Sequence, residues 1–301
     1  MHSRKTFLRC FAALAGFGGC GILALAQGPA PAPLMTHQLK PNVYWIEGGG
    51  GNSGVIVGDK GVIVVDAKTT PAAGKELLED IAKITPKPVT TVILTHSDGD
   101  HVNGLASFPP GISIIAHENN KKEQQTALAA GGRGAPPAEH LPTQTVSKNK
   151  ENLKIDGVKV EVLHWAPAHT SGDLVVYLPD EKIVFTGDII ATQLPDPLIH
   201  LEKNGSSEGW ITTTKGIVGL KADQFVPGHG NVQTKAEVEK RLTDAEAKRA
   251  KIKDLVAQGK SLDEIKAAVG DQPPAAGRGG RGPAFASFTE VVYRELTKKA
   301  S

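Results

Sequence analysis

The sequence has almost no cysteine. Its 301 residues include 2 cysteines, Cys10 and Cys20, and both lie in an apolar stretch near the N-terminus. The rest of the chain can therefore form neither disulfides nor thiolate metal sites. Any metal site beyond residue 20 must use histidine and carboxylate side chains.

Aromatic residues and net charge are also scarce. Aromatics make up 5% of the chain, and the formal net charge is +2. Surfaces that bind nucleic acid usually combine a basic patch with aromatic side chains on which bases stack. We therefore expect no nucleic-acid partner. Hydrophobic residues at 40% and charged residues at 22% are typical of a soluble globular domain.

Residues 1–26 have the layout of a secretory signal peptide. The basic segment MHSRKTFLR precedes the apolar run CFAALAGFGGCGILALA, and Ala24-Leu25-Ala26 offers a small-x-small cleavage site. A membrane anchor is the alternative, but the run is short, contains glycines and is followed by GPAPAP. SRKTFLR also resembles the twin-arginine export signal, with Lys5 in place of the second arginine. We expect a periplasmic or secreted protein without stable membrane insertion after cleavage.

The remaining chain predicts two strand-rich halves followed by helices. We expect a proline-rich spacer at 27–36, one domain at 37–233, and a C-terminal helical extension at 234–301 packed on that domain. The expected strands cover 43–47, 53–58, 61–66, 89–95 and 112–117, then NLKID, VKVEVLH, DLVVYLP, KIVFTGD and the strand and loop ADQFVPGHG. The expected helices open at Thr70 or Pro71 and cover 206–220, 234–258, a short segment capped by Ser261 with Glu264, and about 287–299. GDKG (58–61) predicts a hairpin turn, and the glycine- and proline-rich segment 129–144 predicts a mobile loop or lid.

Histidine and aspartate gather where strand-like runs end. The stretches are THSDGDH with His96, Asp98, Asp100 and His101, PAHTSGD with His169, VFTGD with Asp188, and VPGHG with His229. Imidazole nitrogens and carboxylate oxygens are ligands that suit zinc, iron and manganese. The pattern predicts a metal site assembled from four loops.

The order of these motifs resembles the metallo-β-lactamase superfamily. Its first motif is usually H-x-H-x-D-H, followed by a histidine, an aspartate in a GD turn and a final histidine in GHG. The similarity covers about residues 37–240, and HWAPAHTSGDLVVYLP resembles the periplasmic lactamase-like and quinoprotein-relay subgroup. The resemblance implies an α/β (α+β) fold, a four-layer αββα sandwich with metals at one edge.

The resemblance also implies a ligand set. His96, position 98 and His169 would hold a first metal, Asp100, His101 and His229 a second, and Asp188 would bridge the two. We expect two divalent ions, zinc first, with iron or manganese as options at the first position. Asp100 would also act in catalysis by orienting a metal-bound hydroxide and moving its proton.

Asp98 departs from the family pattern, because histidine is usual there. Two divalent ions with three carboxylates carry one net positive charge less than with two, which makes the centre a weaker Lewis acid. Two imidazoles and one carboxylate also resemble the facial triad of non-haem iron(II) sites. Asp98 could instead only cap a helix or orient a ligand.

The leading hypothesis is an exported metallo-hydrolase. A metal-bound hydroxide would attack an activated carbonyl, such as a lactam, lactone or ester, of a small molecule. True β-lactamase activity is open, because Asp188 stands where some lactamases have cysteine and Ala191 where some have lysine. Two alternatives remain: a mononuclear non-haem iron redox enzyme, and a non-catalytic metal-binding accessory protein.

Several features stay open in the sequence. The sequence context of His164 indicates a structural role, while His200, in the loop 191–206, could line a substrate cleft or lie exposed. Trp165 and Trp210 are predicted to be core residues. The sequence indicates neither the substrate nor the oligomeric state.

Overall fold

The computed structural model describes residues 32–131, 136–271 and 285–298. The expected signal peptide (1–26), the first part of the spacer and the stretch GRGGRG (277–282) lie outside these ranges. Within them, no helix has both the length and the hydropathy to cross a membrane.

Seven strands form the first sheet, in the order β1-β2-β3-β4-β5-β6-β7. β1 (Met35–Lys40), β2 (Val43–Glu47), β3 (Ser53–Val57) and β4 (Val62–Val65) pair antiparallel, and β5 (Val89–Ile93), β6 (Ser113–His117) and β7 (Gln144–Val146) continue the sheet in parallel from β4. The predicted hairpin turn is confirmed, since the Gly58 amide donates to the Gly61 carbonyl at 2.9 Å. The parallel strands place the loops after β4 and β5 at one sheet edge.

Five strands form the second sheet, in the order β12-β11-β10-β9-β8. Its strands are β8 (Lys150–Ile155), β9 (Val158–Leu163), β10 (Val175–Leu178), β11 (Ile183–Phe185) and β12 (Gln224–Val226). Apolar side chains of both sheets meet in one core, among them Trp45, Ile63, Ile93, Val162, Val176 and Phe185. The two sheets are therefore packed face to face by hydrophobic burial.

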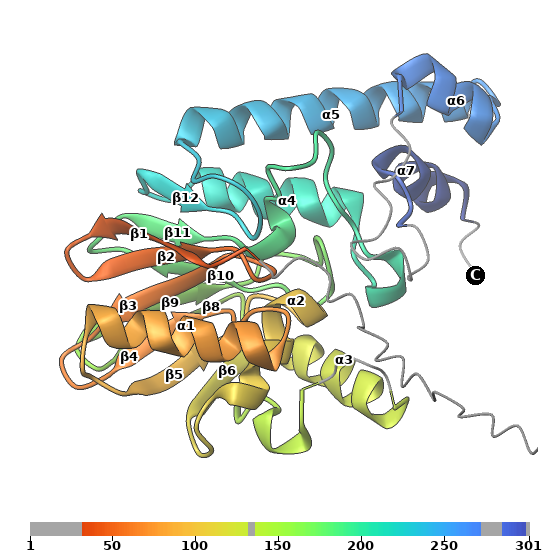
Figure 1. The fold of residues 1–301 in the computed structure, drawn as a ribbon. Helices are drawn as coiled ribbons and strands as arrows, with labels where there is room; N and C mark the ends of the chain where they lie inside the picture. Colours follow the sequence, from red (N-terminus) through yellow and green to blue (C-terminus); the bar gives the residue numbers. More distant parts are fainter. Residues whose placement is uncertain (1–31, 132–135, 272–284, 299–301) are drawn as a thin grey trace, which may run out of the picture. The chain divides into compact units, whose positions relative to one another are not determined.

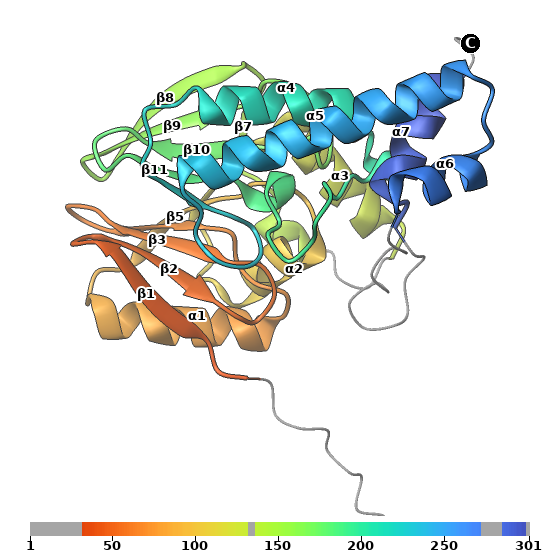
Figure 2. The same ribbon diagram turned by 90° about the horizontal axis from the view of Figure 1, so that it is seen from above.

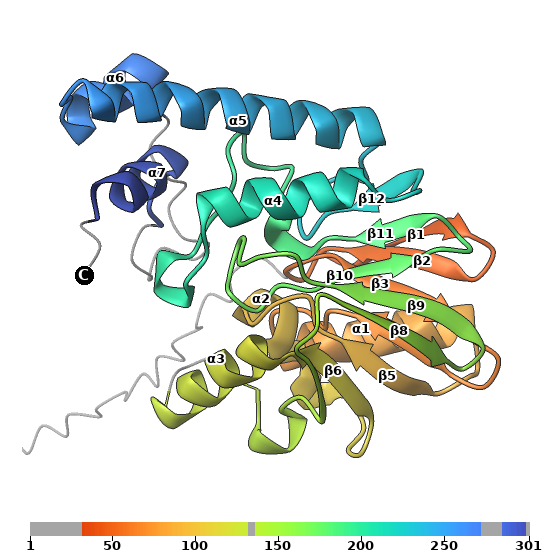
Figure 3. The same ribbon diagram turned by 180° about the vertical axis from the view of Figure 1, so that it is seen from behind.

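Helices cover both outer faces (Figures 1, 2 and 3). On the first sheet lie α1 (Pro71–Ile84) and α3 (Glu118–Ala129), and on the side of the second sheet lie α4 (Ser207–Val218) and α5 (Lys235–Ala257). The helices α6 (Leu262–Val269) and α7 (Phe288–Thr297) pack against α5. Leu77 and Ile81 of α1 pack on the outer face of the first sheet, since their four-residue spacing places them on one side of the helix. The expected four-layer αββα fold is confirmed.

The predicted helix starts are also confirmed. The hydroxyl of Thr70 accepts from the Ala73 amide at 3.1 Å, and Pro71 occupies the first turn. Ser261 and Glu264 form the expected capping box of α6, and Thr234 opens α5 with another.

Two expectations differ from the structure. β1 runs through the end of the expected spacer, because its polar sequence MTHQLK pairs at a sheet edge and carries little hydrophobic signal. α3 was not predicted, since its sequence ENNKKEQQTALA lacks an apolar stripe and its buried side chains are Asn120 and Gln124. Within the expected loop, residues 136–144 pack on the domain, where His140 is buried and its Nε2 lies 3.2 Å from the Phe108 carbonyl.

Candidate metal centre

Loops from both sheets bring the predicted ligands together. His96, Asp98, Asp100 and His101 follow β5, His169 follows β9, Asp188 follows β11 and His229 follows β12. The histidines of this set are all buried, and so is Asp188. The β-strands therefore position the ligands with little freedom left in each loop.

A first group of ligand atoms surrounds the Asp98 carboxylate. Asp98 Oδ2 lies 3.2 Å from His169 Nε2 and 3.8 Å from His96 Nε2. One ligand atom from each of the three residues lies within 4.8 Å of the others. Ligand atoms about 2.1 Å from one tetrahedral ion lie about 3.4 Å apart, so this spacing suits one ion. We call this group the first position.

A second group surrounds His229. Its Nε2 lies 3.0 Å from Asp100 Oδ2 and 3.4 Å from His101 Nε2. Asp188 contacts both imidazoles, with Oδ1 at 3.2 Å from His101 Nε2 and Oδ2 at 3.4 Å from His229 Nε2. We call this group the second position. The rings of His96 and His101 lie 4.2 Å apart between centroids, so the two positions are neighbours.

The chemistry of these atoms fits a metal. His96 Nε2 and Asp188 Oδ1 are buried, and neither has a hydrogen-bond partner among the described residues. A buried polar atom without a partner costs roughly 1–3 kcal/mol, so such atoms call for a ligand. A divalent cation satisfies lone pairs of imidazole and carboxylate together.

The other ring nitrogens of the histidines are already engaged. Asp66 Oδ2 lies 2.8 Å from His101 Nδ1 and accepts from the Thr95 hydroxyl at 2.7 Å. The same hydroxyl lies 2.9 Å from His96 Nδ1, and His169 Nδ1 lies 2.9 Å from the Leu198 carbonyl. Partners at Nδ1 orient each ring so that Nε2 faces the site. Asp66 was missed by sequence reasoning, although its place after the strand 61–66 was a signal.

Close backbone packing supports the second position. A Cβ on Gly51 would lie 2.2 Å from His101 Cε1, and one on Gly228 would lie 1.9 Å from Asp188 Oδ1. Lys68, fully buried, donates to the carbonyls of Ile46 at 2.6 Å and Gly51 at 3.0 Å. Burial lowers the pKa of Lys68 to about 7, despite the opposing charge of Asp66.

Asp98 does not cap a helix. It precedes α2 (Gly99–Val102), but in the described structure its side chain makes no capping hydrogen bond. Lys203 donates instead to Oδ1 at 2.5 Å, and His200 Nε2 lies 3.0 Å from Oδ2. The helix-cap alternative is therefore wrong, and so is an exposed His200, because that residue is buried.

The cluster concentrates charge. Burial raises the pKa of Asp98, but the neighbouring imidazoles of His169 and His200 outweigh it and hold the pKa well below the usual value. The pKa of Asp188 is also held well below its usual value, since His101 and His229 outweigh the effect of burial. Burial lowers the pKa of His101, yet Asp188 and Asp66 raise it well above the ordinary value. A binding metal would therefore displace protons from imidazoles.

Other histidines and tryptophans lie outside the cluster. The ring of His164 stacks on His117 at 4.2 Å between centroids, and its Nδ1 lies 2.8 Å from the Asp173 carbonyl. Trp210 is buried and donates from Nε1 to the Ile189 carbonyl at 2.6 Å. Trp165 is partly buried against the same core. These side chains have structural contacts, as their sequence context indicated.

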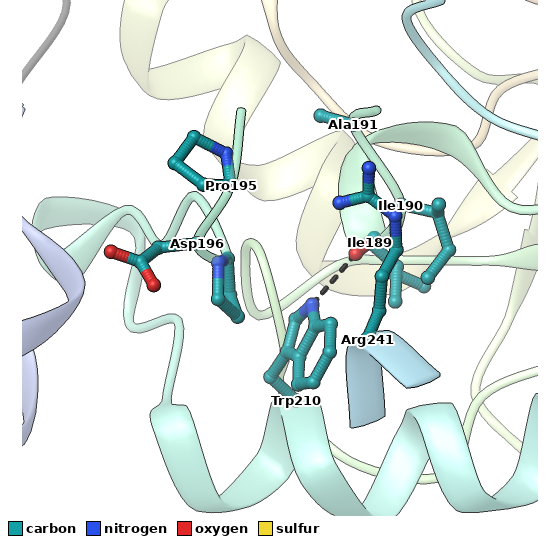
Figure 4. Close-up of a pocket in the computed structure, with 8 residues that line it drawn as sticks. Ile189, Ile190, Ala191, Pro195, Asp196, Trp210 and Arg241 are labelled. Atoms are coloured by element: carbon teal, nitrogen blue, oxygen red, sulfur yellow. Dashed lines mark hydrogen bonds between the residues drawn. The ribbon is translucent and has the colours of Figure 1, made fainter. Parts of the chain in front are cut away.

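A small pocket lies on the loop after Asp188 (Figure 4). It is lined by Ile189, Ile190, Ala191, Pro195, Asp196, Pro197, Trp210 and Arg241. Arg241 of α5 donates to the carbonyls of Leu194 at 3.1 Å and Thr192 at 3.2 Å. None of the lining residues belongs to the metal cluster, so we regard the pocket as part of the support of the loop rather than as the reaction site.

Several known proteins have sequences similar to this chain. The 2,4-dinitroanisole O-demethylase subunit alpha of Nocardioides sp. (strain JS1661) is 29% identical over 252 residues, which cover 81% of this chain and 74% of the relative. A metallo-beta-lactamase type 2 of Bacillus cereus is 29% identical over 188 residues, or 60% of this chain and 67% of the relative.

Solved structures agree on the fold. The inverting sec-alkylsulfatase Pisa1 from Pseudomonas sp. superposes with a TM-score of 0.68 at 19% identity, covering 88% of this chain and 50% of that one. The chain thus spans half the length of that alkylsulfatase. The DIM-1 metallo-beta-lactamase superposes with a TM-score of 0.60 at 20% identity, covering 72% and 99%.

A family model extends over both positions. The model described as metallo-beta-lactamase superfamily matches residues 46–229, from β2 to the last histidine of the cluster, and this is more than half of the 301 residues. Members of this superfamily bind divalent metals, and its hydrolytic relatives here include a lactamase and a linear primary-alkylsulfatase of Pseudomonas sp.. The chain therefore belongs to the metallo-beta-lactamase superfamily, a family of metal-dependent hydrolases.

Proposed function

We propose that this protein is an exported hydrolase that uses two metal ions to cleave an activated carbonyl compound, namely a lactam, lactone or ester. The adjacency of the two positions carries the proposal. His96 and His101 stand one in each position with ring centroids 4.2 Å apart, so two ions bound there would be near enough to act on one substrate.

Each residue of the cluster has a definable task. Divalent ions bound there would lower the pKa of a coordinated water and polarise the carbonyl oxygen of the substrate. Asp100 is the most solvent-accessible carboxylate of the cluster, with a side chain 30% exposed against 13% for Asp98 and 4% for Asp188. Its pKa is lowered to about 2, since His101 and His229 outweigh its burial. Asp100 is thus ionised at neutral pH, where its carboxylate can accept a hydrogen bond from a bound water and orient that water.

Zinc is the proposed metal, with iron or manganese as options at the first position. The donors are imidazoles and carboxylates without thiolate, and this set suits all three metals. Asp188 replaces the cysteine of some lactamases, so lactone or ester cleavage is favoured over β-lactam cleavage. An iron redox enzyme would bind one ion at the two-histidine, one-carboxylate first position.

Metal quantification together with a substrate panel tests the proposal. The protein is purified without added metal and reconstituted with zinc, manganese or iron(II). The panel holds lactams, lactones, carboxylic esters, thioesters, phosphodiesters, alkyl sulfates and an aryl methyl ether. We expect two ions per chain and hydrolysis of at least one carbonyl substrate, with Asp100→Asn reducing turnover at least about a hundredfold. One iron per chain with oxygen uptake would support the redox alternative, and bound metal without turnover would support the accessory role.

Export is a separate part of the proposal. It rests on the three-part layout of residues 1–26. Expression of the full chain in a Gram-negative host should yield a periplasmic product whose mass corresponds to cleavage after Ala26. A full-length product in the cytoplasm would contradict it.

A further inference from the structure

His200 lies against the first position. It directly precedes the short helix η4 (Leu201–Lys203) and is 4% exposed. Its Nε2 lies 3.0 Å from Asp98 Oδ2, the same oxygen that faces His169 Nε2 at 3.2 Å and His96 Nε2 at 3.8 Å. Three imidazole nitrogens therefore converge on one carboxylate oxygen.

The contact between His200 and Asp98 is not a well-formed hydrogen bond. Despite the 3.0 Å separation, His200 Nε2 has no hydrogen-bond partner within the described part of the chain. His96 Nε2 is in the same condition. Atoms that share one metal ion approach to about 3.4 Å without the linear geometry of a hydrogen bond. The contact therefore matches that of two ligands of one ion.

The ring geometry repeats that of the other two histidines. The rings of His169 and His200 are 4.7 Å apart between centroids, with planes at 87°. The rings of His96 and His169 are also 4.7 Å apart at 87°. The His200 ring thus stands at the same distance and the same plane angle from His169 as the His96 ring does.

The second nitrogen of His200 is held by a carboxylate. Nδ1 lies 2.5 Å from Glu202 Oε1. A carboxylate behind an imidazole is the arrangement that orients metal-binding histidines and strengthens them as ligands. His140 is a useful contrast, because it is equally buried but its Nε2 contacts the Phe108 carbonyl.

Backbone hydrogen bonds tie this turn to the His169 loop. The His200 amide donates to the His169 carbonyl at 2.8 Å, and the Ser171 amide donates to the Lys203 carbonyl at 2.8 Å. A Cβ on Gly205 would lie 2.3 Å from the His169 carbonyl oxygen, so the two loops are in direct contact. His200 is therefore placed by the same framework that places His169.

We propose that His200 is the third imidazole ligand of the first metal position, in place of the histidine that residue 98 lacks. Asp98 shares this position, with its Oδ1 bound by Lys203 at 2.5 Å. Because Asp98 and Lys203 together carry no net charge, three imidazoles and this pair keep the charge of a three-histidine position. The inference rests on the metal binding proposed above and goes beyond the ligand set implied by the sequence motifs.

The test measures metal binding without turnover. Metal-free wild-type protein, His200→Ala and the control His140→Ala are titrated with zinc against a chromophoric chelator, and the visible spectrum of each cobalt(II) form is recorded. We expect His200→Ala to weaken the first position at least about tenfold and to change the cobalt(II) bands of that site. The second ion should bind as in wild type, and His140→Ala should match wild type in both readouts. Added imidazole should partly restore the spectrum of His200→Ala.

A second variant keeps the inference testable if His200→Ala folds poorly. Glu202→Gln retains the imidazole and removes only its carboxylate, and we expect a loss of affinity at the first position of up to about tenfold. The inference is overturned if both variants bind the first ion within twofold of wild type with unchanged cobalt(II) spectra. Wild-type protein that binds one ion would contradict only the two-metal proposal, because the His200 comparison can still be made on that ion. Absence of any binding would overturn both.

Discussion

The two metal positions are supported in different ways. The second position rests on packed backbone, since Gly51 and Gly228 leave no room for a Cβ beside His101 and Asp188. The first position depends in addition on side-chain contacts, because Lys203 binds Asp98 and Glu202 binds His200. These supporting side chains are 26% and 64% exposed.

This difference explains where the sequence departs from the family pattern. Close packing in the second position penalises a change at His101 or Asp188, because backbone atoms lie directly against both side chains. Polar side chains on a surface loop can exchange roles more easily, so a carboxylate and a lysine can stand where a histidine is usual. We expect the second position to tolerate substitution less than the first.

Asp188→Asn is expected to have the largest effect of these substitutions, and this effect should fall on the second position. It removes a buried charge that contacts both His101 and His229 while keeping the shape of the side chain. We expect kcat/KM to fall at least about a thousandfold, or roughly 4 kcal/mol of transition-state stabilisation, with loss of the second ion. Metal analysis and steady-state kinetics check this. Retention of two ions with near-normal turnover would rule out Asp188 as an essential ligand.

Gly51→Ala tests the role of backbone packing. The added Cβ would overlap the His101 ring, so the ring or the loop must move. We expect about a hundredfold weaker binding at the second position and little change at the first, measured by chelator competition. Gly219→Ala is the matched control, because that Cβ would lie 3.3 Å from the Gly216 carbonyl oxygen and the backbone is helical. An equal loss of metal affinity at both positions would contradict the view that different contacts stabilise the two positions.

Asp98→His tests whether Lys203 belongs to the first position. The change restores the family-typical histidine but leaves the Lys203 ammonium beside imidazoles without its carboxylate. We expect about tenfold weaker binding of the first ion, and recovery when Lys203→Met is added. The double-mutant cycle of metal affinities measures this coupling. Tighter binding of the first ion by Asp98→His alone would show that Lys203 does not affect metal binding at the first position.

Lys68→Met has the smallest expected effect on metal binding and a distinct effect on stability. The pKa of Lys68 is lowered from 10.5 to about 7, so between pH 7 and 10.5 the unfolded chain binds more protons than the folded one. Stability from this group therefore rises with pH through that window, by about 1 kcal/mol per pH unit.

Urea unfolding of wild type and Lys68→Met at pH 7, 8 and 9 measures the difference. In Lys68→Met, the free energy of unfolding should lack the increase with pH that the titration of Lys68 contributes. Lys75→Met, at a side chain 75% exposed, is the control. An identical pH slope in wild type and Lys68→Met would show that Lys68 does not titrate as its burial indicates.

Most of the fold was predictable because hydrophobic periodicity and capping residues act locally. The strands before each motif and helices α1, α4, α5, α6 and α7 follow from such patterns. β1 and α3 were not predicted from the sequence. An edge strand of polar residues and a helix with buried Asn120 and Gln124 have no local apolar pattern. Their formation depends on neighbours distant in the sequence.

The sequence by itself determined the family, the four-layer architecture and the seven candidate ligands, because short motifs after buried strands survive as recognisable patterns. The tertiary structure alone decided which side chains surround Asp98. His200 and Lys203 lie about a hundred residues further along the chain and belong to no motif. Only the contact between the His169 loop and the turn at η4 brings them to the first position, since coordination depends on distances in space that sequence spacing does not encode.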